Sequence, residues 1–425
     1  MHALAVLLSA ALAVAPAWAI DYQAGPDDYR ALLSRLRPGD HLLLRAGDYE
    51  RGLPLHHLAG EPGRPIVIEG RSGTRFLARP GAHTVSLLDV SHIVIRNLEL
   101  DGRNQPVDAV KAEGHSRYAH YVTLENLTIH DHAASQQNVG ISSKCPAFGW
   151  VVRGNRIERV GTGMYFGNSD GNDPFVAGLI EGNRVSDTIG YNLQIKHQIA
   201  RPAAMPELDA PHDTVIRHNF FSKEAAWPDR AARPNVLIGH APLSGPGSQD
   251  RVLVYGNLFW QNPSEALFQG EGNLAIYNNL FVNSQGHALH IQPHNDVPRQ
   301  VDIFQNTVLA RGHGIRVLRR EGATPLWPQR VMHNLVFAGQ PIRGGEASNN
   351  LTGNADAAAR FLKKPFVELE QLDLAPRRAL AGEVRPETPG LAAYPDSDQD
   401  IDGHARSAPI LGACVAEAEA PCPKH

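Results

Sequence analysis

LIEGNRVS, residues Leu179–Ser186, is one copy of a motif that recurs along most of the 425-residue chain. In each copy, apolar residues in alternation lead into an Asn and then into a second apolar run, a pattern that indicates two short β-strands joined at a corner. Successive Asn residues are between 16 (Asn334 to Asn350) and 38 (Asn219 to Asn257) positions apart. The copies carry Asn97, Asn126, Asn155, Asn183, Asn219, Asn257, Asn279, Asn306, Asn334 and the degenerate Asn350.

Each repeat is too short to bury its own apolar face, so neighbouring repeats have to stack on one another. Gly and Asn supply the left-handed backbone that corners require, and 39 Gly residues are available for it. The LxxLxL framework of a leucine-rich repeat is absent, and a propeller blade needs about 40 residues. The sequence therefore predicts an all-β, right-handed parallel β-helix in which the nine Asn residues from 97 to 334 stack at one corner, joined by side-chain amides.

The segments outside the repeats predict a cap and a tail. Pro26–Arg37 reads as a short amphipathic helix that covers the N-terminal end of the solenoid, followed by strands at His41–Arg45 and Pro65–Glu69. Beyond about residue 355 the repeat dissolves into a segment rich in Pro, Ala and charge, which we expect to pack along the solenoid or to cap it. The predicted parts are 1–19 (signal peptide), 20–354 (β-helix with its cap) and 355–425 (tail).

Composition excludes several classes of protein. The chain has 40 Lys and Arg against 44 Asp and Glu, a formal charge of −4, whereas nucleic-acid-binding domains are usually basic. A hydrophobic content of 42% suits a globular chain. Cys414 and Cys422 can close a small loop under oxidising conditions, which leaves Cys145 unpaired, and no zinc-binding spacing exists. We expect a monomer that does not bind nucleic acid.

The N-terminus indicates export. Ala3–Pro16 is an uncharged apolar run, and Ala17-Trp18-Ala19 is a small-x-small cleavage site, so a signal peptide and a secreted or periplasmic protein are predicted. The alternative is an N-terminal membrane anchor, for which the apolar stretch is short. No later segment is long and apolar enough to span a membrane.

Two stretches carry a resemblance to a known family. LLSRLRPGDHLLLRAGDY (residues 32–49) and RPIVIEG (residues 64–70) resemble the N-terminal cap and first coils of secreted polysaccharide lyases, closest to the family of chondroitinase B and the alginate lyases. Asp398–Gly403, with Arg406, resembles the C-terminal ends of secreted β-helix enzymes. The resemblance implies a pectate-lyase-like solenoid that cleaves an anionic polysaccharide or oligosaccharide containing uronate.

The family also implies a site. Its members carry a strand with Glu residues that leads into a catalytic Lys, and here the matching strand is Tyr191–His197, with Lys196 as the base. Asn192 and Gln194 stand where the family has calcium-binding acids, so no cofactor is expected and calcium is not supported. Gly239 stands where the family has a catalytic Arg, which makes His240 the nearest substitute.

Strand alternation indicates a site on the same strand, Tyr191–His197. If Leu193 and Ile195 face the core, then Asn192, Gln194 and Lys196 share the outer face. Aligned coils predict an outward column with Lys196 between two glycines, and the longest insertions are expected to form walls around it. The predicted column is Ser142, Gly167, Lys196, Gly239, Gln269 and Gln292. The predicted walls are Ile199–His212, Glu224–Pro234 and Ala241–Gln249.

These residue types suit β-elimination from a uronate, which needs a base for the proton next to the carboxylate and a proton for the leaving oxygen. Lys196 is the predicted base, if neighbouring cations or burial lower its pKa, and Arg201, Arg233, His197 and His240 are candidate cations. His240 is the predicted proton donor, with Tyr165 second. Sugar contacts are predicted for Tyr165, Asn192, Gln194, His197, Arg233 and Gln269.

Alternatives stay open at this point. Lys196 can simply be a solvated charge, and the fold can serve a uronate C5-epimerase, which shares the first chemical step, or a non-catalytic glycan-binding protein. Hydrolysis by paired carboxylates is disfavoured, because the paired aspartates are missing. His287 and His290 are expected on opposite strand faces, which disfavours a shared metal. Asn168–Asp173 is interpreted as a polar turn.

Overall fold

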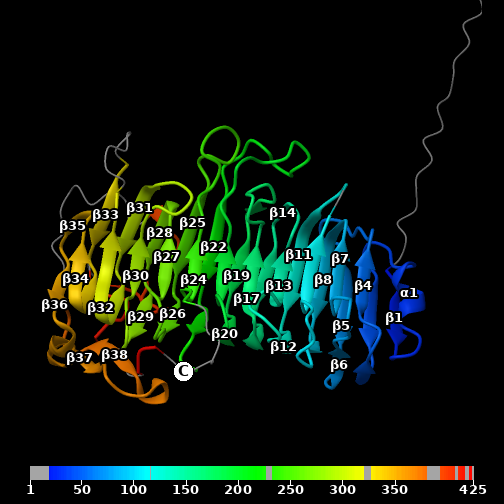
Figure 1. Cartoon of the computed structure of the whole chain (residues 1–425), viewed down its shortest axis with the longest axis horizontal. Helices are drawn as coiled ribbons and strands as arrows, with labels where there is room; N and C mark the ends of the chain where they lie inside the picture. The colour runs from blue at the N-terminus through cyan, green and yellow to red at the C-terminus, as the bar shows by residue number, and fades with distance from the viewer. Residues whose placement is uncertain are drawn as a thin grey trace, which may run out of the picture.

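The computed structural model describes residues 19–114, 116–225, 232–319, 327–380, 393–406, 410–416 and 421–423. The predicted signal peptide therefore lies outside the described residues, except for Ala19. The described chain winds into an elongated solenoid of stacked parallel strands (Figure 1). The prediction of an all-β, right-handed parallel β-helix is confirmed.

Each coil contributes strands to three faces, and each strand pairs in parallel with its counterparts in the coils before and after it. The first face consists of β1 (Asp21–Ala24), β2 (His41–Leu44), β5 (Ile66–Gly70), β8 (Val90–Arg96), β11 (Ala119–Glu125), β15 (Val151–Arg153), β19 (Leu179–Glu181), β22 (Asp213–Arg217), β25 (Arg251–Tyr255), β28 (Gly272–Tyr277), β31 (Pro298–Phe304), β33 (Gln329–Met332) and β35 (Glu346–Ser348), with β14 (Ala147–Phe148) and β18 (Phe175–Val176) as a side branch.

The second and third faces belong to one continuous sheet. The second consists of β3 (Gly47–Tyr49), β6 (Thr74–Leu77), β9 (Glu99–Asp101), β12 (Thr128–His132), β16 (Arg156–Val160), β20 (Arg184–Thr188), β23 (Phe220–Ser222), β26 (Leu258–Trp260), β29 (Leu280–Asn283), the first part of β32 (Thr307–Val317), the first part of β34 (Leu335–Arg343) and β36 (Leu351–Gly353). The third, which we call the site face, consists of β4 (Leu53–His56), β7 (Val85–Leu88), β10 (Val110–Glu113), β13 (Val139–Ser143), β17 (Thr162–Phe166), β21 (Leu193–Ile195), β24 (Val236–Ile238), β27 (Phe268–Gly270), β30 (Leu289–Ile291) and the ends of β32 and β34.

Alternation along these strands fills the interior with one continuous apolar core. In β21, for example, Leu193 and Ile195 are buried inside the solenoid, as the sequence predicted. Aromatic rings continue the stacking from coil to coil, as Phe259 and Phe281 do with ring centroids 4.5 Å apart. The core fixes the direction in which each outward side chain points, and so it fixes the composition of the site face.

The predicted Asn stack is confirmed from Asn155 to Asn350. Within it, each buried side-chain amide donates to the side-chain oxygen of the next Asn, as Asn183 Nδ2 does to Asn219 Oδ1 at 2.9 Å. The backbone N–H of Asn183 donates to the same oxygen, also at 2.9 Å. The members are Asn155, Asn183, Asn219, Asn257, Asn279, Asn306, Asn334 and Asn350.

The register predicted for the first two copies is wrong by one position. Asn97 and Asn126 lie at the same corner, but with φ of 58° and 53° they occupy the left-handed residue that precedes the stack. Gly154, with φ of 65°, occupies that left-handed position in the next coil. Leu127 occupies the stack position itself and donates its N–H to Asn155 Oδ1 at 2.8 Å. Asn suits both positions, because its side chain also tolerates positive φ, so the residue type alone could not fix the register.

The N-terminal cap is shorter than predicted. α1 covers only Arg30–Leu33, with turns on either side. Leu33 in the helix and Leu36 beyond it are buried against the first coils. The sequence analysis also missed β1, which pairs with β2 and forms the first rung of the solenoid. A single turn suffices to cover the open end, and an isolated helix of this length gains too little from its own hydrogen bonds to extend further.

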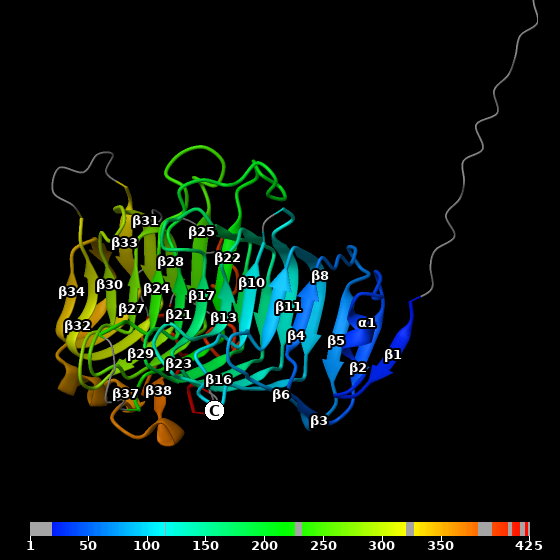
Figure 2. The ribbon, with the colours of Figure 1, turned by 45° about the vertical axis from the view of Figure 1, so that its right-hand side comes forward.

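The segment after β36 folds back along the second face (Figure 2). It contains η1 (Ala355–Arg360), β37 (Leu362–Lys364), η2 (Leu369–Gln371) and β38 (Asp373–Pro376). Leu372 and Leu374 bury against strands β26, β29 and β34. Cys414 and Cys422 form the predicted disulfide, and Cys145 is free and buried.

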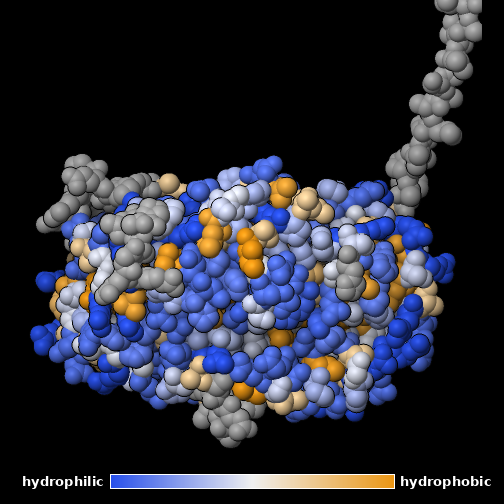
Figure 3. Space-filling view, turned by 45° about the horizontal axis from the view of Figure 1, so that its top comes forward, coloured by the Kyte–Doolittle hydropathy of each residue, from blue (hydrophilic) through white to orange (hydrophobic). Residues whose placement is uncertain are grey.

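The surface is mostly hydrophilic, with small and separate hydrophobic areas (Figure 3). Two of the large exposed apolar side chains, Ile199 and Leu243, belong to the long insertions. Among the described residues, no helix is both long and apolar enough to cross a membrane.

Candidate functional site

Lys196 follows β21 on the site face, in the middle of the solenoid, and its side chain is half-buried. Its neighbours in the stack are glycines, as predicted: Gly167 in the coil before and Gly239 in the coil after. A Cβ on Gly239 would lie 2.3 Å from the backbone nitrogen of His197, so no larger residue fits there without backbone movement. The glycines leave space on both sides of the Lys196 side chain.

The rest of the predicted column is wrong in two places. The strand register puts Lys144 and Glu271 in line with Lys196, whereas Ser142 and Gln269 lie two residues earlier, in line with Gln194. Connections between strands differ in length from coil to coil, so counting from the Asn corner does not fix the register on the next face. The observed column is Lys144, Gly167, Lys196, Gly239, Glu271 and Gln292.

Lys144 is therefore a site residue that the sequence analysis missed. Its amine lies 3.5 Å from the centroid of the Tyr165 ring, in a cation–π contact. Burial lowers the pKa of Lys144 to about 8, and the charges of Lys111 and Lys196 lower it as well, against the opposing effect of Asp108. Lys144 lies two residues after Ser142, which the sequence analysis placed on the outer face. The correct strand register, together with strand alternation, would therefore have identified Lys144 as a site residue.

The pKa of Lys196 is also lowered by burial, although the carboxylate of Glu271 opposes the shift. Glu271 is 1% exposed. Its Oε2 accepts the backbone N–H groups of His294, Asn295 and Asp296 at 2.8, 2.8 and 3.0 Å, and its Oε1 has no hydrogen-bond partner among the described residues. Glu271 thus anchors the 294–296 loop and places a negative charge near Lys196.

His197 and His240 form the edge of the site beyond Lys196, with ring centroids 5.4 Å apart. Burial, together with the nearby His240 and Lys196, lowers the pKa of His197, which keeps its imidazole neutral at neutral pH. His240 is 4% exposed, and its Nδ1 lies 2.8 Å from the carbonyl oxygen of Ala241. That contact requires a proton on Nδ1, so neutral His240 presents Nε2 as an acceptor.

Two of the predicted sugar-contact residues, Asn192 and Gln194, are buried. Asn192 is fully buried at the corner before β21, where its Nδ2 donates to Thr188 Oγ1 at 3.1 Å and to the Ser222 carbonyl at 3.0 Å. The prediction that Asn192 shares the outer face with Lys196 is wrong, because strand alternation begins only at Leu193. Gln194 lies between Tyr165 and Leu237, as predicted, and is 4% exposed.

Arg233 lies before β24, at the end of the site face where its strands begin. Its guanidinium lies 5.9 Å from the ring centroid of Tyr191, a residue that the sequence analysis did not single out. Burial raises the pKa of Tyr191 and that of Tyr165, so both phenols keep their protons. Tyr165 lies beside Gln194 in the adjacent rung, and Tyr191 lies before β21, at the other end of that strand from Lys196.

Two of the insertions, which connect β21 with β22 and β24 with β25, pack on each other. Arg201, predicted as a cation at the rim, is instead buried: its guanidinium donates to the carbonyls of Leu208 and Ala210 and forms an ion pair with Asp250. A Cβ on Gly247 would lie 2.9 Å from the Arg201 side chain, which shows how closely the second insertion approaches. Both insertions stand out from the solenoid beside β22 and β25 (Figures 1 and 2). The third, Glu224–Pro234, lies partly outside the described residues.

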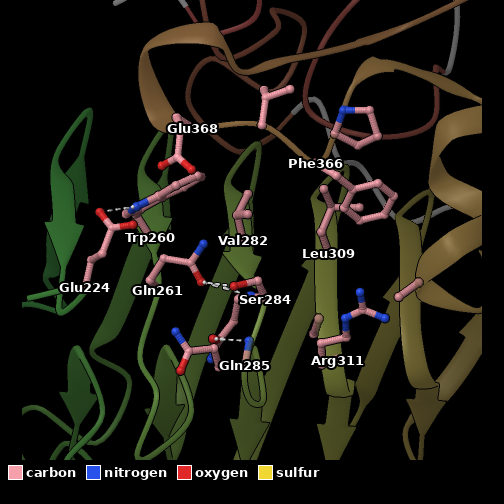
Figure 4. A pocket seen from close by; sticks show the side chains of 15 residues that line it. Glu224, Trp260, Gln261, Val282, Ser284, Gln285, Leu309, Arg311, Phe366 and Glu368 are labelled. Carbon is pink, nitrogen blue, oxygen red and sulfur yellow. Dashed lines mark hydrogen bonds between the residues drawn. The ribbon is translucent and has the colours of Figure 1, made fainter. Parts of the chain in front are cut away.

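A cavity of about 310 Å³ lies away from Lys196, between the second face and the C-terminal segment. Its wall contains Trp260, whose indole N–H donates to Glu224 at 2.9 Å, and Gln261, which accepts from Ser284, with Phe366 and Glu368 opposite (Figure 4). None of the predicted site residues lines this cavity.

The residues around Lys196 do not fit a calcium site. Asn192 is buried at a corner, Gln194 offers a single neutral oxygen, and one oxygen of Glu271 is occupied by three backbone amides. In the described part of the chain, the side-chain groups arranged closely enough for a metal are Asp101–His130–Asp131 and Asp400–Asp402–His404, and neither contains a site residue. The Asn168–Asp173 segment forms a turn, with Gly171 N–H donating to the Asn168 carbonyl at 3.0 Å.

Comparison of the sequence with protein-family models and with curated proteins gives no match. Solved structures do resemble the chain. A point mutant of the family 6 alginate lyase AlyGC is 12% identical with a TM-score of 0.50, over 78% of this chain and 51% of the lyase, so the chain spans about half the length of that enzyme. Pectate lyase Pel9A is 14% identical with a TM-score of 0.50, over 94% of this chain and 90% of that enzyme.

The lacto-N-biosidase of glycoside hydrolase family 136 from Eubacterium ramulus is also similar, with 15% identity and a TM-score of 0.51 over 79% of this chain and 68% of that one. At these identities the likeness concerns the fold, which both lyases and a hydrolase use. The resemblance to β-helix polysaccharide lyases that the N-terminal sequence indicated is confirmed at that level. The chain has the parallel β-helix fold of alginate and pectate lyases.

Proposed function

We propose that this protein is a secreted or periplasmic polysaccharide lyase that cleaves a uronate-containing glycan by β-elimination. The observation that carries the proposal is the pair of half-buried lysines, Lys144 and Lys196, on either side of Gly167. Both have lowered pKa values. One lysine can then take a proton while the other offsets negative charge, and these are the two tasks that elimination next to a carboxylate requires.

In the proposed mechanism, neutral Lys196 removes the proton on the carbon next to the uronate carboxylate. Protonated Lys144 holds that carboxylate and stabilises the negative charge that develops on it. A bound carboxylate raises the pKa of Lys144 again, because an opposite charge favours the ammonium form. The electron pair then forms the double bond as the glycosidic bond breaks, and the leaving oxygen takes a proton.

We assign that last proton to Tyr165, because its raised pKa keeps the hydroxyl protonated and it lies beside Gln194 in the adjacent rung. His240, the first candidate from the sequence, donates from Nε2 only as an imidazolium, since its Nδ1 faces the Ala241 carbonyl. In the proposal His240 and His197 line the sugar site, together with Gln194, Arg233 and Gln269.

Two other functions are distinguished by their products. A C5-epimerase shares the proton abstraction but returns a proton to the opposite face and leaves the glycosidic bond intact. A glycan-binding protein performs neither step. The two lysines favour chemistry over simple binding, because burying a cation without a task is costly.

The first test is a screen of uronate polymers. We expect ultraviolet absorbance of an unsaturated uronate to appear when the purified protein is incubated with one of alginate, polygalacturonate or chondroitin sulfate. Carboxyl-reduced samples of the same polymers are the matched control and should give no signal. Solvent deuterium entering the polymer without any absorbance would identify an epimerase and contradict the proposal.

The second test uses the pKa of Lys144. Because kcat/KM reports on the free enzyme, loss of the Lys144 proton, with a pKa of about 8, should limit kcat/KM at alkaline pH, against the rise that comes from deprotonation of Lys196. Lys144→Arg keeps a cation at every pH in this range, so it should retain activity, and its kcat/KM should rise further at alkaline pH than that of the parent. Lys144→Met should lower kcat/KM about 10²-fold, in line with the loss of one group that stabilises transition-state charge.

A pH profile of Lys144→Arg that matches the parent's at alkaline pH would show that Lys144 does not limit kcat/KM there. Lys364→Met is the matched control, because Lys364 is an exposed lysine on β37, away from the site face. That substitution should leave the pH profile almost unchanged.

A further inference from the structure

A second cluster of basic side chains lies on the site face, toward the C-terminal end of the solenoid. The imidazole of His287 lies 4.9 Å, centroid to centroid, from both His290 and His313, and the latter two rings are 5.6 Å apart. Arg316 pairs with His290 in the strand register. The sequence-based interpretation that His287 and His290 face opposite ways is wrong, because residue 287 lies at the corner before β30.

Several polar atoms of this cluster are buried without a partner. His290 is 5% exposed, and its Nε2 has no hydrogen bond within the described residues. The same is true of His313 Nδ1 and Arg316 Nε. His287 Nδ1 accepts the backbone N–H of His313 at 2.9 Å, so the ring proton of neutral His287 lies on Nε2, which can donate. Buried polar atoms normally have partners, and these groups therefore indicate a ligand.

The titratable groups of this cluster are all basic. Burial lowers the pKa of His290 to about 3, and the neighbouring groups that add to the shift, His287, Arg316 and His313, are all basic. Arg343 extends the row, because it pairs with Arg316 in the next rung and also lowers the pKa of His313. Among the described residues, the groups that shift the pKa of His290 and of His313 are all basic, and such a concentration of guanidinium and imidazole donors suits an anion.

A metal ion fits less well. The ring nitrogens of the three histidines are not among the sets in the described chain that come close enough together for one ion. The Arg316 cation would also repel a metal ion. A carboxylate, in contrast, accepts two parallel N–H bonds from a guanidinium and further bonds from imidazole N–H groups.

The position of the cluster relative to Lys196 follows from the register. Gln194, Leu237, Gln269, His290, Arg316 and Arg343 form one column, and Gln194 lies two residues before Lys196 on the same strand. With rungs ~4.8 Å apart, His290 lies about 14 Å from the Gln194 rung, Arg316 about 19 Å and Arg343 about 24 Å. A polysaccharide chain that runs along this column spans several sugar units between Lys196 and Arg343.

We propose that His287, His290, His313, Arg316 and Arg343 form a distal subsite that binds a carboxylate on a sugar several units away from the one at Lys196. The inference rests on the proposed function for its substrate class, a polymer with repeated uronate groups. The subsite makes the protein selective for longer anionic chains, because a short oligosaccharide cannot occupy both places at once.

Binding measurements on the cleavage-deficient Lys196→Ala protein test the inference. By isothermal titration calorimetry, hexamers of alginate or of polygalacturonate should bind at least about tenfold more tightly than dimers of the same sugar. Arg316→Gln and, separately, the exposed Arg343→Gln should each weaken hexamer binding about tenfold, the loss of one charge-assisted contact, and leave dimer binding unchanged. Arg311→Gln is the matched control, because Arg311 also lies on β32 but pairs with Asp356.

The outcomes separate this inference from the proposed function. Hexamer affinity that is unchanged in both Arg316→Gln and Arg343→Gln, or the absence of any length dependence, would overturn the subsite even if the parent protein cleaves the polymer. Length-dependent binding that both variants weaken would support the subsite even if the parent protein cleaves no polymer. Chondroitin sulfate hexamers, when compared with alginate hexamers, show whether sulfate replaces carboxylate as the bound anion. Thermal unfolding of each variant, matched to the parent, shows that the fold is intact.

Discussion

Replacing Lys196 by alanine is expected to lower kcat by ~10²–10⁴-fold on whichever uronate polymer the parent protein cleaves, the usual effect of removing a positioned general base. The structure supports a direct effect on chemistry, because the side chain points out of the core between Gly167 and Gly239. Its loss creates no core cavity, and thermal stability should change little. Initial rates of ultraviolet absorbance, measured with saturating polymer, give kcat.

Lys196→Arg should fail almost as completely, because a guanidinium stays protonated and cannot accept the proton. This outcome is opposite to the one expected for Lys144→Arg, so the two arginine variants together separate the base from the charge-stabilising cation. Lys364→Ala, on the short strand β37 far from the site face, is the control for surface lysines. Full activity in Lys196→Ala would place the base elsewhere, and Lys144 would then be the next residue to test.

The fold could be predicted from the sequence because its signal is repeated many times. Alternating residues, the Asn motif and the glycines each occur in coil after coil, so the architecture does not depend on the interpretation of any single residue. The exceptions are local. Asn97 and Asn126 lie one position before the Asn stack, because Asn is compatible both with positive φ and with the stacked position.

The site was less predictable, because it depends on register between strands whose connections vary in length. Counting from the Asn corner placed Lys196 correctly between two glycines, but put Ser142 and Gln269 where Lys144 and Glu271 lie. Burial was the second difficulty. Arg201 looks like a free cation in the sequence, but its partner Asp250 lies 49 residues away, in a pairing that only the packing of the two insertions reveals.

The largest effect on stability is expected from the Asn stack. Asn219 is 2% exposed, and its Oδ1 accepts both the backbone N–H and the side-chain amide of Asn183, each at 2.9 Å. Its own Nδ2 donates to the carbonyls of Ile180 and Arg217 at 2.9 Å and to Asn257 Oδ1 at 3.0 Å. Asn219→Ala therefore removes side-chain hydrogen bonds that reach three coils, and the two donors of Asn183 lose their acceptor Oδ1.

Each buried polar group left without a partner costs ~1–3 kcal/mol, and two donors of Asn183 lose their acceptor. We therefore expect Asn219→Ala to lower the free energy of unfolding by ~3–5 kcal/mol. Urea titration, followed by circular dichroism, measures the change. Asn126→Gly is the matched control, because Asn126 lies exposed at the same corner with φ of 53°. Gly154, Gly182 and Gly256 occupy this position in later coils, so the substitution should cost less than ~0.5 kcal/mol. If the two variants unfold at the same urea concentration, the side-chain bonds of the stack contribute nothing to stability, and apolar packing between coils alone holds the solenoid together.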